Sequence, residues 1–97
     1  MSDATQKFRL MATSGYERDI RSLIRQNPDI LNMAERALNI LEQDPYNKTR
    51  QYDVKKLKGV EVGKGQWRIR VGKYRLRYDI FNQDVVLYSF RHRKEAY

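Results

Sequence analysis

Arginines are the side chains of this chain whose spacing most clearly indicates chemistry. Residues 67–78 read W-R-I-R-V-G-K-Y-R-L-R-Y, so that apolar and basic side chains alternate on both sides of Gly72 and Lys73. An alternation with a period of two is typical of a strand that buries one face. A two-residue turn at Gly72 and Lys73 would pair the two halves as a hairpin. The facing residues are then Val71 and Tyr74, Arg70 and Arg75, Ile69 and Leu76, Arg68 and Arg77, and Trp67 and Tyr78.

This register places four arginines on one face of the hairpin and apolar side chains on the other. Like charges at directly opposed strand positions destabilise a sheet. A sequence that keeps this repulsion predicts a surface that holds a polyanion. The simpler alternative is a solvated sheet face, although four arginines on one face exceed ordinary surface needs. Trp67 belongs to the apolar face, which favours a place in the core.

The first half of the chain predicts the elements that position this hairpin. Residues 7–12 alternate and read as a short strand, and residues 13–15 form a break that can cap a helix. Apolar residues at helical spacing then predict a helix from Tyr16 onward. Asn27 and Pro28 end it and start a second helix, with Asn27 as N-cap and Pro28 at the first position. The Asp44-Pro45 pair ends the second helix.

The second half predicts strands joined by tight turns. Residues 54–59 are basic with two apolar anchors, which fits either a short strand or a loop. A last strand is expected from Val85 to about Phe90. The order predicts one α+β domain over residues 1–97, with two N-terminal helices on one face of a small, mainly antiparallel sheet of about four strands. The helices would cover the apolar hairpin face and leave the arginine face open to solvent.

Charge and composition narrow the classes of function. Residues 1–46 hold six basic and seven acidic side chains, whereas residues 47–97 hold fourteen basic and five acidic ones. Such asymmetry indicates a nucleic acid, an anionic membrane or an acidic protein as partner. The chain has no cysteine and one histidine, which excludes disulfides and His- or Cys-rich metal sites. No apolar run approaches the roughly 20 residues that span a bilayer, and we expect a cytoplasmic protein.

Three sequence blocks in this order resemble one known family. They are K-K-L-K-G, the arginine hairpin and the ending H-R-K-E-A-Y, and together they are similar to the RelE/ParE toxin superfamily of type II toxin–antitoxin modules. The resemblance covers nearly the whole chain. RelE-like members cut mRNA, typically in the ribosomal A site, without a metal or cofactor. ParE-like members share the fold, lack the nuclease residues and poison DNA gyrase.

The resemblance to the RelE branch implies a toxin that is an mRNA endoribonuclease, with ribosome-bound mRNA and a cognate antitoxin as partners. The ribose 2′-hydroxyl attacks the adjacent phosphate, which requires a base, cations around the phosphorane and an acid for the leaving oxygen. The implied catalytic positions are Arg68, Arg70, Arg75, Arg91, His92, Arg93 and Tyr97. The implied RNA-binding positions are Lys55, Lys56, Lys58 and Arg77.

The chain departs from RelE at Arg68 and Arg70, where RelE has lysines. An arginine holds phosphate charge but does not act as a base, because it stays protonated. His92 is the candidate that fills this role, and Tyr97 would stack on a base or contact phosphate. Glu61 is the carboxylate near the hairpin, and its glycine-rich surroundings favour a loop position instead. The alternatives are surface solvation for the lysines and His92, packing for Tyr97, a ParE-like gyrase inhibitor, and a basic interaction module without activity.

Overall fold

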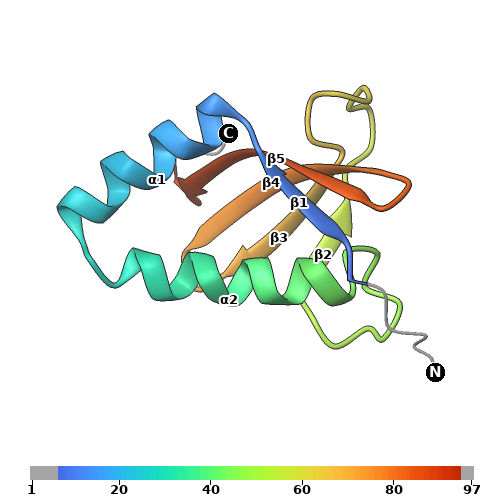
Figure 1. The fold of residues 1–97 in the computed structure, drawn as a ribbon, viewed down its shortest axis with the longest axis horizontal. Coiled ribbons are helices and arrows are strands. Elements are labelled where there is room, and N and C mark those ends of the chain that lie inside the picture. Colours follow the sequence, from blue (N-terminus) through green and yellow to red (C-terminus); the bar gives the residue numbers. More distant parts are fainter. Residues whose placement is uncertain (1–6, 95–97) are drawn as a thin grey trace.

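The computed structural model describes residues 7–94 and contains two helices and five strands in one sheet (Figure 1). Both helices precede all strands but the first. The elements are β1 (Arg9–Ala12), α1 (Ser14–Gln26), α2 (Ile30–Gln43), β2 (Val54–Lys56), β3 (Trp67–Val71), β4 (Tyr74–Phe81) and β5 (Asp84–His92).

The strands are ordered β1-β5-β4-β3-β2 across the sheet. All neighbours are antiparallel except β1, which lies parallel to β5. The sheet therefore has one strand more than the expected four or so, because both short segments, residues 9–12 and 54–56, pair as edge strands. The α+β class and the placing of two helices against the sheet are confirmed.

The β3–β4 hairpin has the predicted register at every pair, from Val71 opposite Tyr74 to Trp67 opposite Tyr78. Gly72 has a φ of 58°, the left-handed value that a turn of this kind requires at its first central position. Only glycine adopts this conformation without steric cost. The local turn chemistry therefore fixes which side chains share a face.

Local capping sets the helix boundaries. The Thr13 side chain accepts a hydrogen bond from the Tyr16 backbone N–H at 3.2 Å, and its hydroxyl donates to the Leu87 carbonyl of β5 at 2.7 Å. Asn27 ends α1, as predicted, but it is not the N-cap of α2. Its side chain accepts from the backbone N–H of Asp29, and α2 begins at Ile30, so Pro28 lies in the turn. A short turn thus separates the helices.

The core lies between the two helices and one face of the sheet. Its sheet side comes from the apolar hairpin face and from β5, and its helix side comes mainly from α2. Burial is complete or nearly so for Ile30, Ala34, Ala37, Leu41, Ile69, Leu76, Tyr78, Val85, Leu87 and Phe90.

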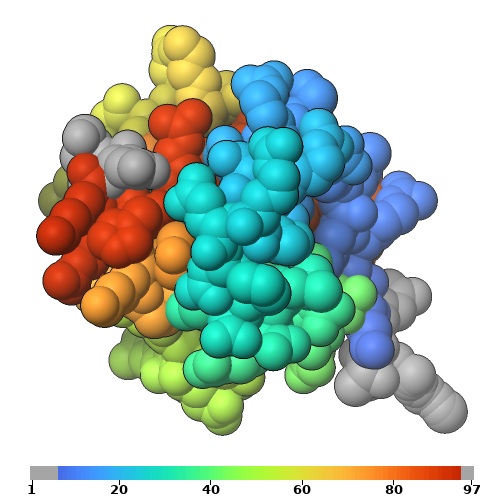
Figure 2. Space-filling model, turned by 90° about the vertical axis from the view of Figure 1, so that its left-hand side faces the viewer, coloured from blue at the N-terminus to red at the C-terminus, as the bar shows by residue number. Residues whose placement is uncertain are grey.

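The exposed end of α1 lies beside the end of β5 (Figure 2). Neither described helix is long and apolar enough to cross a membrane.

Tyr78 joins the sheet to the segment that follows α2. Its hydroxyl donates to the Pro45 carbonyl at 2.7 Å within the core. Burial, together with the charge of Asp44, raises the pKa of this phenol, so the hydroxyl keeps its proton and remains a donor.

We predict that Tyr78→Phe lowers the free energy of unfolding by about 1–2 kcal/mol, because the buried Pro45 carbonyl loses its partner. Urea unfolding followed by circular dichroism measures the loss. Tyr46→Phe is the matched control, since Tyr46 is exposed and should show almost no change. Equal stability of the two variants would contradict the prediction.

Candidate nucleic-acid interface

Three arginines form a row across the centre of the sheet. Arg70 of β3 faces Arg75 of β4, and Arg75 in turn faces Arg91 of β5. Directly paired residues project on the same side of a sheet. All three side chains therefore belong to the face opposite the helices.

A second basic row lies two residues further along β3 and β4, on the same face. Lys55 of the edge strand β2 faces Arg68, and Arg68 faces Arg77. The row ends at Ser89 of β5, which faces Arg77. The sheet thus carries two adjacent basic rows on one surface, which we call the arginine face: Arg70, Arg75, Arg91, Lys55, Arg68 and Arg77.

The arginine face is not wholly open to solvent, and that expectation is wrong for Arg68. The Arg68 side chain is only 8% exposed, and its guanidinium lies 3.1 Å from a carboxylate oxygen of Asp53. The other oxygen of Asp53 is 3.5 Å from Nε of Arg70, which is more exposed. Asp53 is held in place because its carbonyl accepts the Arg70 backbone N–H at 2.9 Å. One carboxylate therefore offsets part of the repulsion that the sequence predicted.

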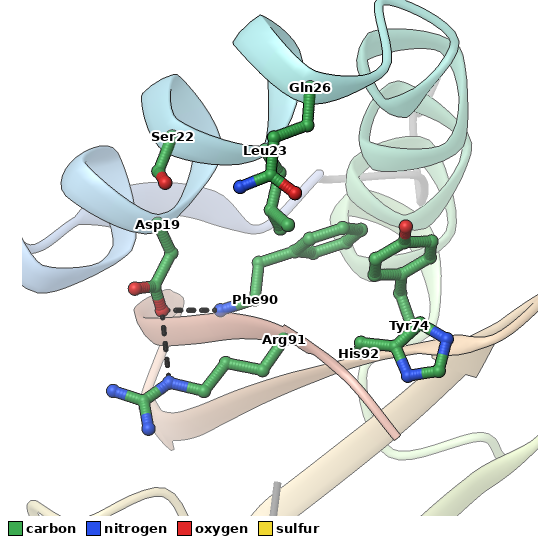
Figure 3. A pocket seen from close by; sticks show the side chains of 8 residues that line it. All are labelled: Asp19, Ser22, Leu23, Gln26, Tyr74, Phe90, Arg91 and His92. Carbon is green, nitrogen blue, oxygen red and sulfur yellow. Dashed lines mark hydrogen bonds and ion pairs between the residues drawn. The ribbon is translucent and has the colours of Figure 1, made fainter. Parts of the chain in front are cut away.

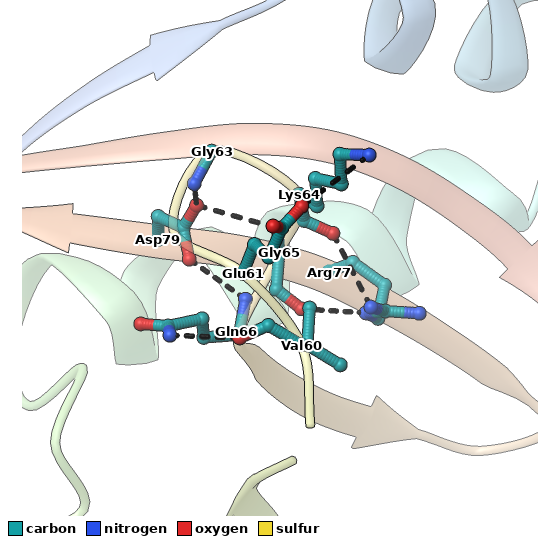
Figure 4. Close-up of polar contacts among 8 residues, drawn as sticks. All are labelled: Val60, Glu61, Gly63, Lys64, Gly65, Gln66, Arg77 and Asp79. Carbon is teal, nitrogen blue, oxygen red and sulfur yellow. Dashed lines mark hydrogen bonds and ion pairs between the residues drawn. The ribbon is translucent and has the colours of Figure 1, made fainter. Parts of the chain in front are cut away.

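A second carboxylate on this face, Asp79, holds the loop between β2 and β3 (Figure 4). Asp79 is 2% exposed, and its oxygens accept backbone N–H bonds from Gly63 at 2.6 Å, Gly65 at 3.3 Å and Gln66 at 2.7 Å. Burial and, after it, the Asp79 charge also raise the pKa of the neighbouring Tyr88. The carboxylate closes the glycine-rich loop over one end of the arginine face.

Arg77 binds the same loop. Its Nε donates to the Gly65 carbonyl at 2.9 Å, and a terminal nitrogen donates to the Lys64 carbonyl at 3.2 Å (Figure 4). Gly65 has a φ of 82°, and a Cβ there would lie 3.0 Å from Cβ of Arg77. Glycine at this position therefore permits the close approach of the loop to the strand. Glu61 belongs to the loop, as expected, and its Oε1 lies 3.7 Å from Nζ of Lys64.

His92 lies on the opposite side of the sheet from the arginine face. It pairs with Tyr74, and the two rings meet edge to face at 5.4 Å, next to the stacked pair of Tyr74 and Phe90 (Figure 3). Its Nδ1 accepts the Lys94 backbone N–H at 3.2 Å. The structure therefore places His92 away from Arg70 and Arg75, although Arg91 lines the same cleft as His92.

The cleft that contains His92 has a volume of about 440 Å³ and separates α1 from the end of β5 (Figure 3). At this cleft Asp19 connects α1 to β5. Its carboxylate accepts the Phe90 backbone N–H at 3.0 Å and lies 3.5 Å from Nε of Arg91. Arg91 thus reaches the helix from the end of the arginine face.

The remaining predicted positions lie at the margins. Arg93 is exposed in the turn after β5, where its backbone N–H donates to the Lys73 carbonyl at 2.8 Å. Lys55, Lys56 and Lys58 are all exposed, and the ammonium of Lys56 lies 5.8 Å from the centre of the Trp67 ring, on the helix side. Tyr97 lies outside the described residues. Within residues 7–94, no group of three or more His, Cys, Asp or Glu side chains could hold a metal ion.

A comparison with models of protein families shows the family to which the chain belongs. Residues 12–97 match the family model of the ParE toxin of the type II toxin–antitoxin system parDE. The chain belongs to the RelE/ParE superfamily of toxins. It is therefore the toxin of a type II toxin–antitoxin module. No curated protein matches this toxin at a significant level.

Solved structures show the same fold. The toxin is similar to a chain of the RelBE2 toxin–antitoxin complex from Mycobacterium tuberculosis, with 27% identity, a TM-score of 0.68, and coverage of 89% of this chain and 98% of that one. A RelB–RelE complex from Methanococcus jannaschii matches with 24% identity, a TM-score of 0.55, and coverage of 87% and 91%. A RelE–RelB complex from Pyrococcus horikoshii matches with 19% identity, a TM-score of 0.62, and coverage of 93% and 99%.

Sequence reasoning missed the two carboxylates of the toxin's arginine face. Asp79 continues the alternation of Arg75 and Arg77 along β4, so its side of the sheet was readable from the sequence. Asp53 lies two residues before Lys55, which places it on the same face once residues 54–56 are recognised as a strand. The burial of Asp79 was not readable, because it depends on a loop that returns over the sheet.

We predict that Asp79→Ala lowers the free energy of unfolding by roughly 2–3 kcal/mol, because buried backbone N–H groups of the loop lose a charged acceptor. Asp84→Ala is the matched control and should cost less than about 1 kcal/mol, since it removes a solvent-exposed ion pair with Arg9. Urea titration of both variants measures the difference. A loss for Asp79→Ala no larger than the control would show that the loop is held by other contacts.

Proposed function

We propose that the toxin is an endoribonuclease that cuts mRNA on the ribosome, in the cytoplasm. The observation that carries this proposal is the row of Arg70, Arg75 and Arg91 on one face of three adjacent strands. Adjacent strands are about 4.8 Å apart, so the long guanidinium side chains can converge on a single phosphate.

The row suits the stabilisation of a phosphorane. The 2′-oxygen bonds to phosphorus and displaces the 5′-oxygen of the next nucleotide, which leaves a 2′,3′-cyclic phosphate and, once that oxygen is protonated, a free 5′-hydroxyl. The intermediate phosphorane carries additional negative charge on its oxygens, and fixed cations stabilise that charge more strongly in the transition state than in the bound substrate. Arg75 is the central member, and it is half-buried between neighbours on both sides. We assign to the row this electrostatic role, and no proton transfer.

Proton removal then falls to another group. His92 was the candidate base, but it lies on the helix side of the sheet, across from the row. Asp53 presents a half-exposed carboxylate beside Arg70 and is the candidate acceptor on the arginine face itself. Tyr97, which the resemblance assigns as an RNA contact, completes the proposed site from the C-terminal segment.

The partner that controls this activity is a cognate antitoxin. Three of the similar solved structures are complexes of a toxin and an antitoxin. We propose that the antitoxin is acidic in its toxin-binding segment and covers part of the arginine face. Charge complementarity supports this proposal, because fourteen of the toxin's basic side chains lie in residues 47–97.

A second candidate is a non-enzymatic inhibitor of DNA gyrase. The match to the ParE family model favours it, and so does the separation of His92 from Arg70 and Arg75. In that case the arginine face is a protein-docking surface.

We predict that Arg75→Gln abolishes both growth arrest and mRNA cleavage after brief induction of the toxin. Loss of one preorganised charge at a reacting centre costs roughly 100- to 1000-fold in rate. Primer extension on cellular mRNA should show new 5′ ends within coding regions for the unaltered toxin and none for the variant. Arg36→Gln, which removes an exposed arginine from α2, is the matched control and should leave cleavage unchanged.

The gyrase alternative gives a different pattern in the same cells. Growth arrest with intact mRNA, accompanied by accumulation of gyrase-dependent DNA breaks, would replace the ribonuclease proposal with gyrase inhibition. Circular dichroism of the purified variants establishes that Arg75→Gln is folded, so that loss of toxicity reports on the site.

A further inference from the structure

A hollow of about 520 Å³ lies beside the edge strand β2, at one end of the arginine face. This size falls within the range of about 300–1,000 Å³ that is usual for sites of small organic ligands. None of the residues that line it is acidic. They are Lys55, Lys56, Leu57, Lys58, Val60 and Arg77.

The planar guanidinium group of Arg77 forms one wall of the hollow, and the orientation of its plane is fixed. Two separate nitrogens of its guanidinium donate to the carbonyls of Gly65 and Lys64, at 2.9 and 3.2 Å. A planar group held at two points cannot rotate freely about its side-chain bonds. Because its partners are carbonyls and not carboxylates, the guanidinium keeps its full positive charge toward a ligand.

Leu57 and Val60 give the hollow an apolar part, and hydrogen bonds hold the backbone of both residues. The backbone N–H of Leu57 donates to the Gln66 carbonyl at 2.7 Å, and the Gln66 side chain donates to the Val60 carbonyl at 2.8 Å. Gln66 is itself bound through its backbone N–H to the buried Asp79. The backbone at Leu57 and Val60 is therefore linked through Gln66 to the same carboxylate that holds the loop.

We propose that this hollow binds one RNA base, stacked on the Arg77 guanidinium and packed against Leu57 and Val60, with the attached phosphate held by Lys55 and Lys58. Proteins that recognise single-stranded RNA stack bases on arginine planes as well as on aromatic rings. The carboxylates of an acidic peptide segment would pair with the lysines. They would not stack on the Arg77 guanidinium or pack against Leu57 and Val60. The chemistry of the lining therefore favours a nucleotide.

The position of the hollow defines which nucleotide it takes. Arg77 follows Arg75 by two residues on the same face of β4, a distance of about 7 Å along the strand. A base in the hollow therefore belongs to the nucleotide that adjoins the phosphate on the arginine row. This inference rests on the proposed RNA-binding function and adds a subsite that selects a base next to the cleaved bond.

The test is equilibrium binding of the whole toxin to a short single-stranded RNA with 2′-O-methyl riboses, which block 2′-hydroxyl attack. An abasic nucleotide is placed at each position in turn. We expect one abasic position to weaken binding about tenfold, the usual contribution of one stacked base. Arg77→Lys, which keeps the charge but removes the plane, should weaken binding of the intact RNA to the same extent.

The combination of the two changes distinguishes stacking from a purely structural role of Arg77. If the base stacks on the guanidinium plane, Arg77→Lys and the abasic position together should weaken binding no more than either alone. Arg21→Lys on α1 is the matched control and should bind as the unaltered toxin does. Lys58→Gln should weaken all RNAs equally and lower the salt dependence of binding.

Three outcomes would overturn the inference. Independent, multiplicative effects of Arg77→Lys and the abasic position would show that Arg77 only braces the loop. RNA binding without any sensitive position would remove the subsite but leave the proposed ribonuclease in place. Failure to bind RNA, with binding of an acidic peptide that Lys58→Gln weakens, would remove the subsite and make the hollow a peptide site, whereas the ribonuclease proposal stands or falls with primer extension on cellular mRNA.

Discussion

The register of the β3–β4 hairpin is the constraint on which the rest of this molecule depends. In a strand, a slip of one residue exchanges the two faces, so it would drive arginines into the core and expose Ile69 and Leu76. Gly72 prevents that slip, because its left-handed conformation fixes a two-residue turn between Val71 and Tyr74. The helices then have one apolar face to cover, and the basic rows have one surface to occupy.

A face with this much positive charge is stable because carboxylates are built into it. Asp53 contacts both Arg68 and Arg70 at the edge of the sheet, and Asp79 organises the loop that Arg77 also binds. The exposure of the arginines therefore differs along the face. Arg68 is nearly buried and Arg77 is hydrogen-bonded to the loop, whereas Arg70 and Arg91 are exposed. Arg70 and Arg91 remain exposed even though a carboxylate oxygen, of Asp53 and of Asp19 respectively, lies 3.5 Å from the Nε atom of each.

The alternation of residues 67–78 and the turn at Gly72 were sufficient to predict the hairpin and its register. The helical spacing of apolar residues from Tyr16 onward, with the breaks at Pro28 and Pro45, was sufficient to predict the two helices. The position of His92 could not be predicted in this way. Tyr88 is an extra residue in β5, opposite the junction of Arg77 and Tyr78, and this β-bulge shifts the alternation that follows. It turns Arg91 toward the arginine face and His92 toward the helices. A bulge depends on the partner strand, which a pattern within one segment does not reveal.

The pairing of β1 with β5 joins the beginning of the described chain to its last strand. During synthesis, β1 has no partner until β5 has been made, and the arginine row lacks Arg91 until the same moment. Domains fold as units when their long-range contacts become available. The complete basic surface can therefore be assembled only after β5 has been synthesised, long after the residues of β1 have left the ribosome.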